Sequence, residues 1–181
     1  MFLEQHISLK ERKMRVFEES QKFTQTWIMI LVVISLLFPM ILLINEWGNN
    51  SDYSLSANLD LFLALIIVII SISPLLLFKL TTRIDEQGIK YQFYPFHLKL
   101  KVISWDELSD VYIRKYDAVS EYGGWGLKGG FFFKKKGIAY NVSGNIGIQL
   151  MLKSGKKILI GTKQKEKVQQ VLDYYNNKEN D

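Results

Sequence analysis

The hydrophobic and polar positions divide the chain into two apolar stretches and a region of alternation that follows them. No charged residue occurs from Trp27 to Ile44 or from Leu61 to Phe78. A helix of about 20 apolar residues, rising about 1.5 Å per residue, covers the roughly 30 Å of a bilayer core. The pattern therefore predicts two transmembrane helices, at about 27–45 and 60–79, which form a hairpin over residues 27–80.

Basic residues flank the two stretches and do not occur between them. Several Lys and Arg precede Trp27, and Lys79 and Arg83 follow the second stretch, whereas residues 45–58 contain neither. Loops rich in Lys and Arg stay in the cytoplasm, so both termini are predicted to be cytoplasmic. A signal peptide is the alternative for the first stretch, but the segment before it is longer than the charged start of a signal peptide.

The cytoplasmic N-terminal segment, residues 1–26, carries a short apolar periodicity. A helix would place Leu3, Ile7, Met14 and Phe17 on one side, with charged residues interleaved. Such a helix would either lie on the membrane surface or extend the first span.

From Thr82 the pattern alternates every second residue, which is typical of strands. Gln87-Gly88 and Ser154-Gly155 mark turns between strand-like runs. About six or seven antiparallel strands are expected in total. In the run after Pro95, one face carries Leu98, Leu100 and Val102, and the other carries His97, Lys99, Lys101 and Ile103.

After Thr162 the period changes to that of a helix, predicted over residues 163–176. Apolar residues recur at the spacing that lets a helix cover a sheet. Thr162 is the predicted N-cap, and residues 177–181 form a polar tail. The stripe consists of Val168, Val171, Leu172 and Tyr175.

This order of strands and helix resembles the pleckstrin-homology (PH) architecture. The sequence is similar to a family of small bacterial membrane proteins with two transmembrane helices and a C-terminal PH-like domain. The resemblance rests on the segments EESQKFTQTW, ISWDELSDVYIRKY, EYGGWG, GIAYNVSGNIGIQLML and KILIGT. It implies an α+β PH-like domain over residues 81–176, an antiparallel, partly open barrel of about seven strands capped by the C-terminal helix. It also implies a multi-pass protein of the bacterial plasma (inner) membrane, and it carries over no catalytic residue.

The amino-acid composition limits which kinds of catalytic or metal site the chain could form. The chain has no cysteine and two histidines, His6 and His97, which argues against a thiolate metal site, a disulfide framework and a histidine-based hydrolase. We therefore predict no metal, cofactor or catalytic residue. The net charge of +5 is modest and gives no specific indication of nucleic-acid binding.

The glycine-rich stretch Glu121–Gly130 could be a phosphate loop or a strand corner. It lacks the Lys-Ser/Thr ending and the following helix of a phosphate loop, so bulged strands are the favoured interpretation. Within it, Trp125 is a candidate anchor for a partner or a lipid interface.

Lysines are the remaining candidates for contact with a partner or an anionic lipid. Consecutive lysines in a strand point to both faces, so a solvated edge is the alternative. The main candidates besides Trp125 are Lys128, Lys134, Lys135 and Lys136. Weaker headgroup candidates are Lys90, Lys99 and Lys101, which have Lys where a bidentate Arg is expected.

One group of carboxylates could support acid–base chemistry, but salt bridges with Arg114 and Lys115 are the favoured interpretation. The group consists of Asp106, Glu107, Asp110, Asp117 and Glu121.

The sequence predicts a non-catalytic, membrane-anchored PH-like module. It would be integral to the lipid bilayer and would bind a protein partner or another copy of itself at the cytoplasmic face. The alternative is a domain that binds anionic lipid headgroups. A membrane enzyme of unknown chemistry is a remote third possibility.

Overall fold

The computed structural model describes residues 15–49, 59–129 and 137–179. They form two compact units. One is Phe23–Leu77, and the other combines the described residues up to Lys22 with those from Phe78 onward. This division differs from the predicted one, in which residues 1–26 stood apart and the folded domain began at residue 81.

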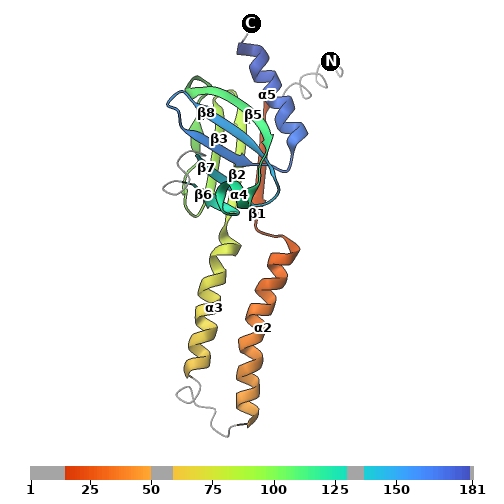
Figure 1. The fold of residues 1–181 in the computed structure, drawn as a ribbon, viewed down its shortest axis with the longest axis vertical. Coiled ribbons are helices and arrows are strands. Elements are labelled where there is room, and N and C mark those ends of the chain that lie inside the picture. Colours follow the sequence, from red (N-terminus) through yellow and green to blue (C-terminus); the bar gives the residue numbers. More distant parts are fainter. Residues whose placement is uncertain (1–14, 50–58, 130–136, 180–181) are drawn as a thin grey trace, which may run out of the picture. The chain divides into compact units, whose positions relative to one another are not determined.

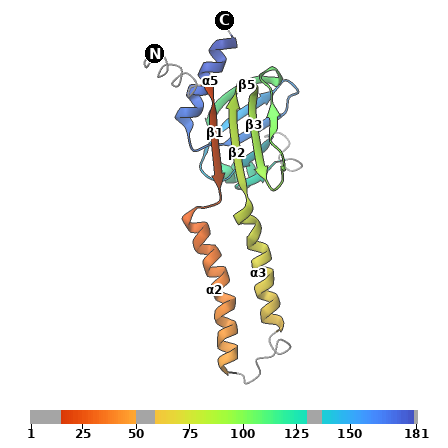
Figure 2. The same ribbon diagram turned by 180° about the vertical axis from the view of Figure 1, so that it is seen from behind.

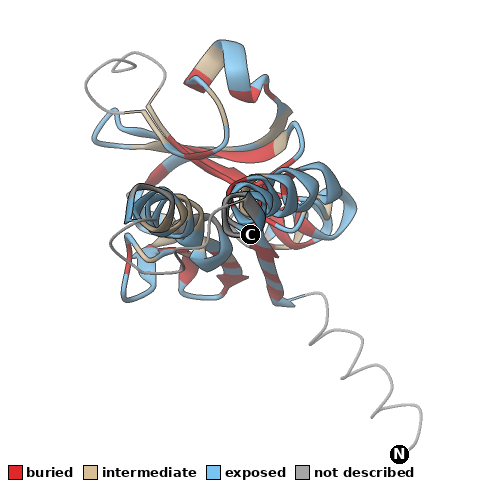
Figure 3. Cartoon of the chain, turned by 90° about the horizontal axis from the view of Figure 1, so that it is seen from below, coloured by how far each residue is buried: buried red, intermediate tan, exposed pale blue. Residues whose placement is uncertain are grey.

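The Phe23–Leu77 unit consists of helices α2 (Thr26–Asn49) and α3 (Leu59–Leu77), which contact each other. Most of their described apolar side chains are exposed, as Figure 3 shows by colour. The hydroxyls of Ser35 and Ser71 donate to backbone carbonyls of the preceding turn. These helices therefore present an almost purely apolar surface.

The predicted transmembrane hairpin needs correction. Within the described parts of the chain, no helix is long and apolar enough to cross a membrane. The structure therefore does not support a membrane hairpin over residues 27–80. Nor does it support a multi-pass protein of the bacterial inner membrane with cytoplasmic termini.

The second unit is an α+β fold with two sheets (Figures 1 and 2). The first sheet has the order β1 (Phe17–Lys22), β2 (Lys79–Asp85), β3 (Gly88–Tyr94), β4 (Lys101–Ile103), and every pair is antiparallel. The second has the order β5 (Leu108–Lys115), β8 (Ile146–Leu152), β9 (Lys157–Gly161), β7 (Ile138–Asn141), β6 (Gly126–Lys128).

The predicted PH-like barrel is therefore corrected as well. The described residues form nine strands divided between two sheets, with no closed barrel. One pair, β7 and β9, is parallel, because the chain passes from β7 to β8 on the far side of β9. The predicted turns at Gln87-Gly88 and Ser154-Gly155 do join antiparallel neighbours, β2 to β3 and β8 to β9.

Strand β1 comes from the N-terminal segment, where a helix was predicted. Its side chains alternate between buried and exposed, and the buried ones are Phe17, Glu19 and Gln21. The Glu19 carboxylate accepts a 2.6 Å hydrogen bond from the Thr162 hydroxyl and one of 3.0 Å from the Lys163 N–H. Phe17 is thus part of a strand, while Leu3, Ile7 and Met14 lie outside the described residues.

Helix α5 (Lys165–Glu179) packs against β5 and β1 (Figure 1). All four residues of the predicted stripe are buried. The helix begins two residues later than predicted. The Thr162 hydroxyl accepts a hydrogen bond from the Gln164 N–H, and the Gln164 carbonyl accepts the Val168 N–H, so Gln164 occupies the N-cap position.

Candidate functional site

The structure describes only two of the five main predicted contact residues, Trp125 and Lys128. Lys134, Lys135 and Lys136 lie outside the described residues. Lys128 ends β6. Trp125 is exposed just before β6, and its indole N–H donates to the Gly144 carbonyl at 3.4 Å. The exposure of Trp125 keeps it available as a contact residue.

The glycine-rich stretch has a structural explanation at two points. Gly123 has φ 76° and follows the short helix α4 (Ala118–Tyr122) as its C-cap. The N–H groups of Gly123 and Gly124 bond back to the carbonyls of Val119 and Ala118, which closes the helix end. At Gly129 a Cβ would lie 2.3 Å from the Gly137 carbonyl oxygen. Only glycine fits at that close approach.

Lys90 is held by an ion pair and is therefore a poor headgroup ligand. Its ammonium lies 2.8 Å from Asp85, which also bonds Arg83 at 2.9 Å and the Gln87 N–H. Burial by itself would raise the pKa of Asp85, but the hydrogen bonds and charge of these partners together lower it below the ordinary value. The pair closes the turn between β2 and β3.

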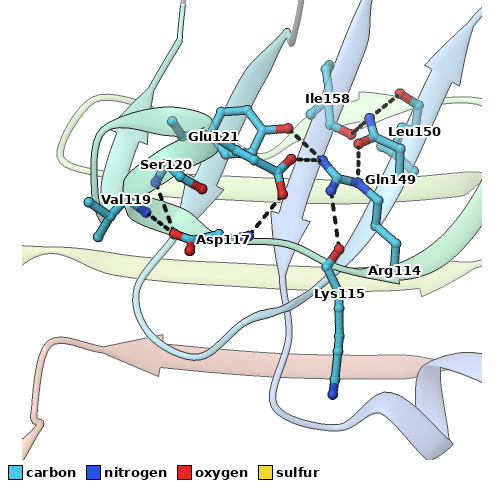
Figure 4. A network of polar contacts seen from close by, with 10 residues as sticks. Arg114, Lys115, Asp117, Val119, Ser120, Glu121, Gln149, Leu150 and Ile158 are labelled. Carbon is cyan, nitrogen blue, oxygen red and sulfur yellow. Dashed lines mark hydrogen bonds and ion pairs between the residues drawn. The ribbon is translucent and has the colours of Figure 1, made fainter.

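Two of the predicted carboxylates belong to a network around Arg114 and α4 (Figure 4). The Arg114 guanidinium lies 2.8 Å from Glu121 and donates to the buried Gln149 amide oxygen and to the Tyr122 hydroxyl, each at 3.0 Å. Asp117 caps α4, and the N–H groups of Ser120 and Val119 lower its pKa. This arrangement holds α4 against the second sheet.

The remaining carboxylates are not brought together with that network. Glu107 forms a capping box with Ser104 at the one-turn 3₁₀ helix Trp105–Glu107, and Asp110 lies on β5. Within the described residues there is also no group of three side chains able to hold a metal ion. The arrangement favours structural roles for these acids.

The largest departure from the sequence pattern lies between β3 and β4. Residues 95–100 form a turn and a bend rather than a strand, so alternation does not divide them into two faces. Leu98 is 79% exposed, and Leu100 and Val102 are exposed too. Lys99 and Lys101 are also exposed, whereas His97 and Ile103 are buried. We call the exposed residues Tyr94, Phe96, Leu98, Leu100 and Val102, with the intervening Lys99 and Lys101, the 94–102 surface.

Hydrogen bonds around His97 hold the turn between β3 and β4. The His97 N–H donates to the Phe93 carbonyl at 2.9 Å, and the His97 Nδ1 accepts the Phe93 N–H at 3.3 Å. The Gln92 amide donates to the carbonyls of His97 and Leu98. The imidazole packs against the rings of Tyr91 and Tyr140. With His97 directed into the core, Leu98 points outward.

The environment of His97 predicts a pH-dependent stability. Burial, and then the charge of Lys101, lowers the pKa of His97. In the unfolded chain the pKa of a histidine is about 6.5. Just below that pH the unfolded chain therefore binds more protons than the folded chain, and the free energy of unfolding falls on acidification. Urea denaturation should show a lower midpoint at about pH 5.5 than at about pH 7. His97→Gln should remove part of this difference, and a pH dependence equal to that of the wild-type chain would contradict the assignment.

The chain matches no protein-family model, and comparisons with curated proteins and with solved structures likewise give no significant match. The class of protein therefore rests on the fold, a two-sheet α+β unit linked to a pair of apolar helices. The resemblance to a bacterial PH-like family stays a prediction.

Proposed function

We propose that the protein is a non-catalytic binding module that self-associates through α2 and α3. The observation that supports this proposal is the exposed apolar surface of these two helices. Residues such as Ile34, Phe38 and Ile41 of α2 and Ile67 and Ile70 of α3 are all more than half exposed. Monomeric proteins rarely expose contiguous apolar surface on this scale.

A second copy of the chain is the occupant that fits this surface. From Trp27 to Ile44 and from Leu61 to Phe78 there is no charged residue, so the helices select an apolar partner. Another α2–α3 pair offers the same surface, and two such pairs can pack as a four-helix bundle. No group of metal ligands in the described residues favours a metalloenzyme instead.

Sedimentation velocity of the full chain over a range of concentrations tests the proposal. The protein should sediment as a dimer or larger assembly, and Ile34→Glu or Ile67→Glu should weaken association about 30-fold or more, because each charge would be buried in an apolar interface. Val119→Glu is the matched control, since Val119 is exposed on α4. A wild-type chain that is monomeric at every concentration, or association unaffected by the helix variants, would contradict self-association.

A further inference from the structure

We propose that the 94–102 surface docks onto an anionic lipid surface, inserting its apolar side chains between headgroups while its lysines contact the phosphates. This inference is independent of self-association through α2 and α3. It concerns residues of the two-sheet unit, where the apolar side chains of Leu98, Leu100 and Val102 are exposed.

The first supporting observation is the alternation of apolar and basic side chains. Leu98, Leu100 and Val102 are exposed, and Lys99 and Lys101 between them are exposed as well. From Gly88 to Trp105 the sequence contains no Asp or Glu. The segment is therefore apolar and carries only positive charge, and it complements a layer that is apolar inside and anionic outside.

The adjacent ends of β1, β2 and β3 add further basic and aromatic side chains to the 94–102 surface. Lys22 of β1 pairs with Lys79 of β2, and Lys79 pairs with Tyr94 of β3, so the three residues form one row across the sheet. All three are exposed. Aromatic residues such as Tyr94 and Phe96 are enriched where protein meets the lipid headgroups. The row places further positive charge beside the residues that would insert.

The segment is also held in shape before any binding. The hydrogen bond from Gln92 to the His97 carbonyl and the one from the Phe93 N–H to His97 Nδ1 fix the turn. The Phe96 ring stacks on Phe93, and its centroid lies 5.7 Å from that of Phe78. A preformed surface loses little conformational entropy when it binds.

A lipid surface fits these residues better than a protein partner does. A protein interface that buried Leu98 and Leu100 would also desolvate Lys99 and Lys101, and it would have to supply a carboxylate for each. At a lipid surface, lysine side chains extend to the headgroups while apolar neighbours insert. Each such lysine contributes to binding of an anionic leaflet, and the contribution falls with salt.

The absence of cysteine from the chain permits a site-specific test. An environment-sensitive fluorophore attached to Leu98→Cys in the full chain should shift to the blue with vesicles of phosphatidylcholine and phosphatidylglycerol. The shift should be absent with pure phosphatidylcholine and should fade at high salt. Lys99→Gln and Lys101→Gln should each weaken this response about fivefold, whereas Lys153→Gln and Lys156→Gln, at the exposed β8–β9 turn, should not.

The same fluorophore attached to Ser154→Cys, in the β8–β9 turn, serves as the control for non-specific adsorption. Three results would overturn the proposal. They are no shift at Leu98 with anionic vesicles, an equal shift with neutral vesicles, and an equal shift at Ser154. A shift at Leu98 that needs no vesicles and grows with protein concentration would also overturn it, because the 94–102 surface would then be covered by another copy.

Discussion

Removal of residues 1–22 should abolish cooperative folding of the two-sheet unit, although this segment precedes the apolar helices in the chain. Strand β1 pairs with β2 along its whole length and buries Phe17. The Tyr175 hydroxyl also donates to the Arg15 carbonyl, which joins the segment to α5. Together these losses should exceed about 5 kcal/mol, a large part of the stability of a typical domain.

A point variant gives a sharper form of the same prediction. Glu19→Ala leaves the buried Thr162 hydroxyl and the Lys163 N–H without their acceptor, and should lower the free energy of unfolding by about 2–3 kcal/mol. Glu18→Ala is the matched control, because Glu18 is the adjacent residue of the same type on the exposed face. Urea denaturation followed by near-UV circular dichroism measures both variants. Equal stability of the two would show that β1 is not part of the folded unit.

Tyr122→Ala should produce the second large loss, about 3–5 kcal/mol. The Tyr122 side chain is fully buried in a small core with Tyr116, Ala118, Ala139 and Leu159. Its removal leaves a cavity between α4 and the second sheet, and it also deprives Arg114 of one acceptor. The free energy of unfolding from urea denaturation is the quantity to compare.

Two further variants separate packing from hydrogen bonding at this site. Tyr122→Phe keeps the ring and removes only the hydroxyl, so it should cost about 1 kcal/mol. Val119→Ala changes an exposed residue of the same helix and should cost less than about 0.5 kcal/mol. A loss for Tyr122→Ala no greater than that for Val119→Ala would mean that α4 does not pack as described.

Local patterns in the sequence predicted the elements whose cause is local. The turns at Gln87-Gly88 and Ser154-Gly155 and the stripe on α5 all follow from residues within a few positions of one another. For these elements a periodicity or a turn residue carried the information. Salt bridges of the carboxylate group with Arg114 and Lys115 were also predicted, and one of them, between Arg114 and Glu121, is present.

Strand β1 could not be found in this way because two of its buried residues are polar. Glu19 and Gln21 are accommodated by Thr162, Lys163 and Gly161, far along the chain. Hydrophobic periodicity does not reveal a strand whose buried polar side chains form their hydrogen bonds with residues far along the chain.

The two strand faces predicted for residues 97–103 were wrong for a related reason. Residues 95–100 form a turn and a bend, and only Lys101–Ile103 is a strand. The hydrogen bonds between His97 and Phe93 hold this turn, and alternation along the sequence does not reveal them. The membrane hairpin was a different kind of error, since apolar composition alone suggested a span that the described helices do not provide.

The central claim is that α2 and α3 form an interface between copies of the chain, and cysteine cross-linking tests it most directly. Single cysteines at successive positions from Ile30 to Ile41 of α2 should form disulfide-linked dimers on oxidation, strongest at positions three or four residues apart. A cysteine at Ser154, on the other unit, should not. Dimers at no helix position, or equally at every position including Ser154, would contradict the claim.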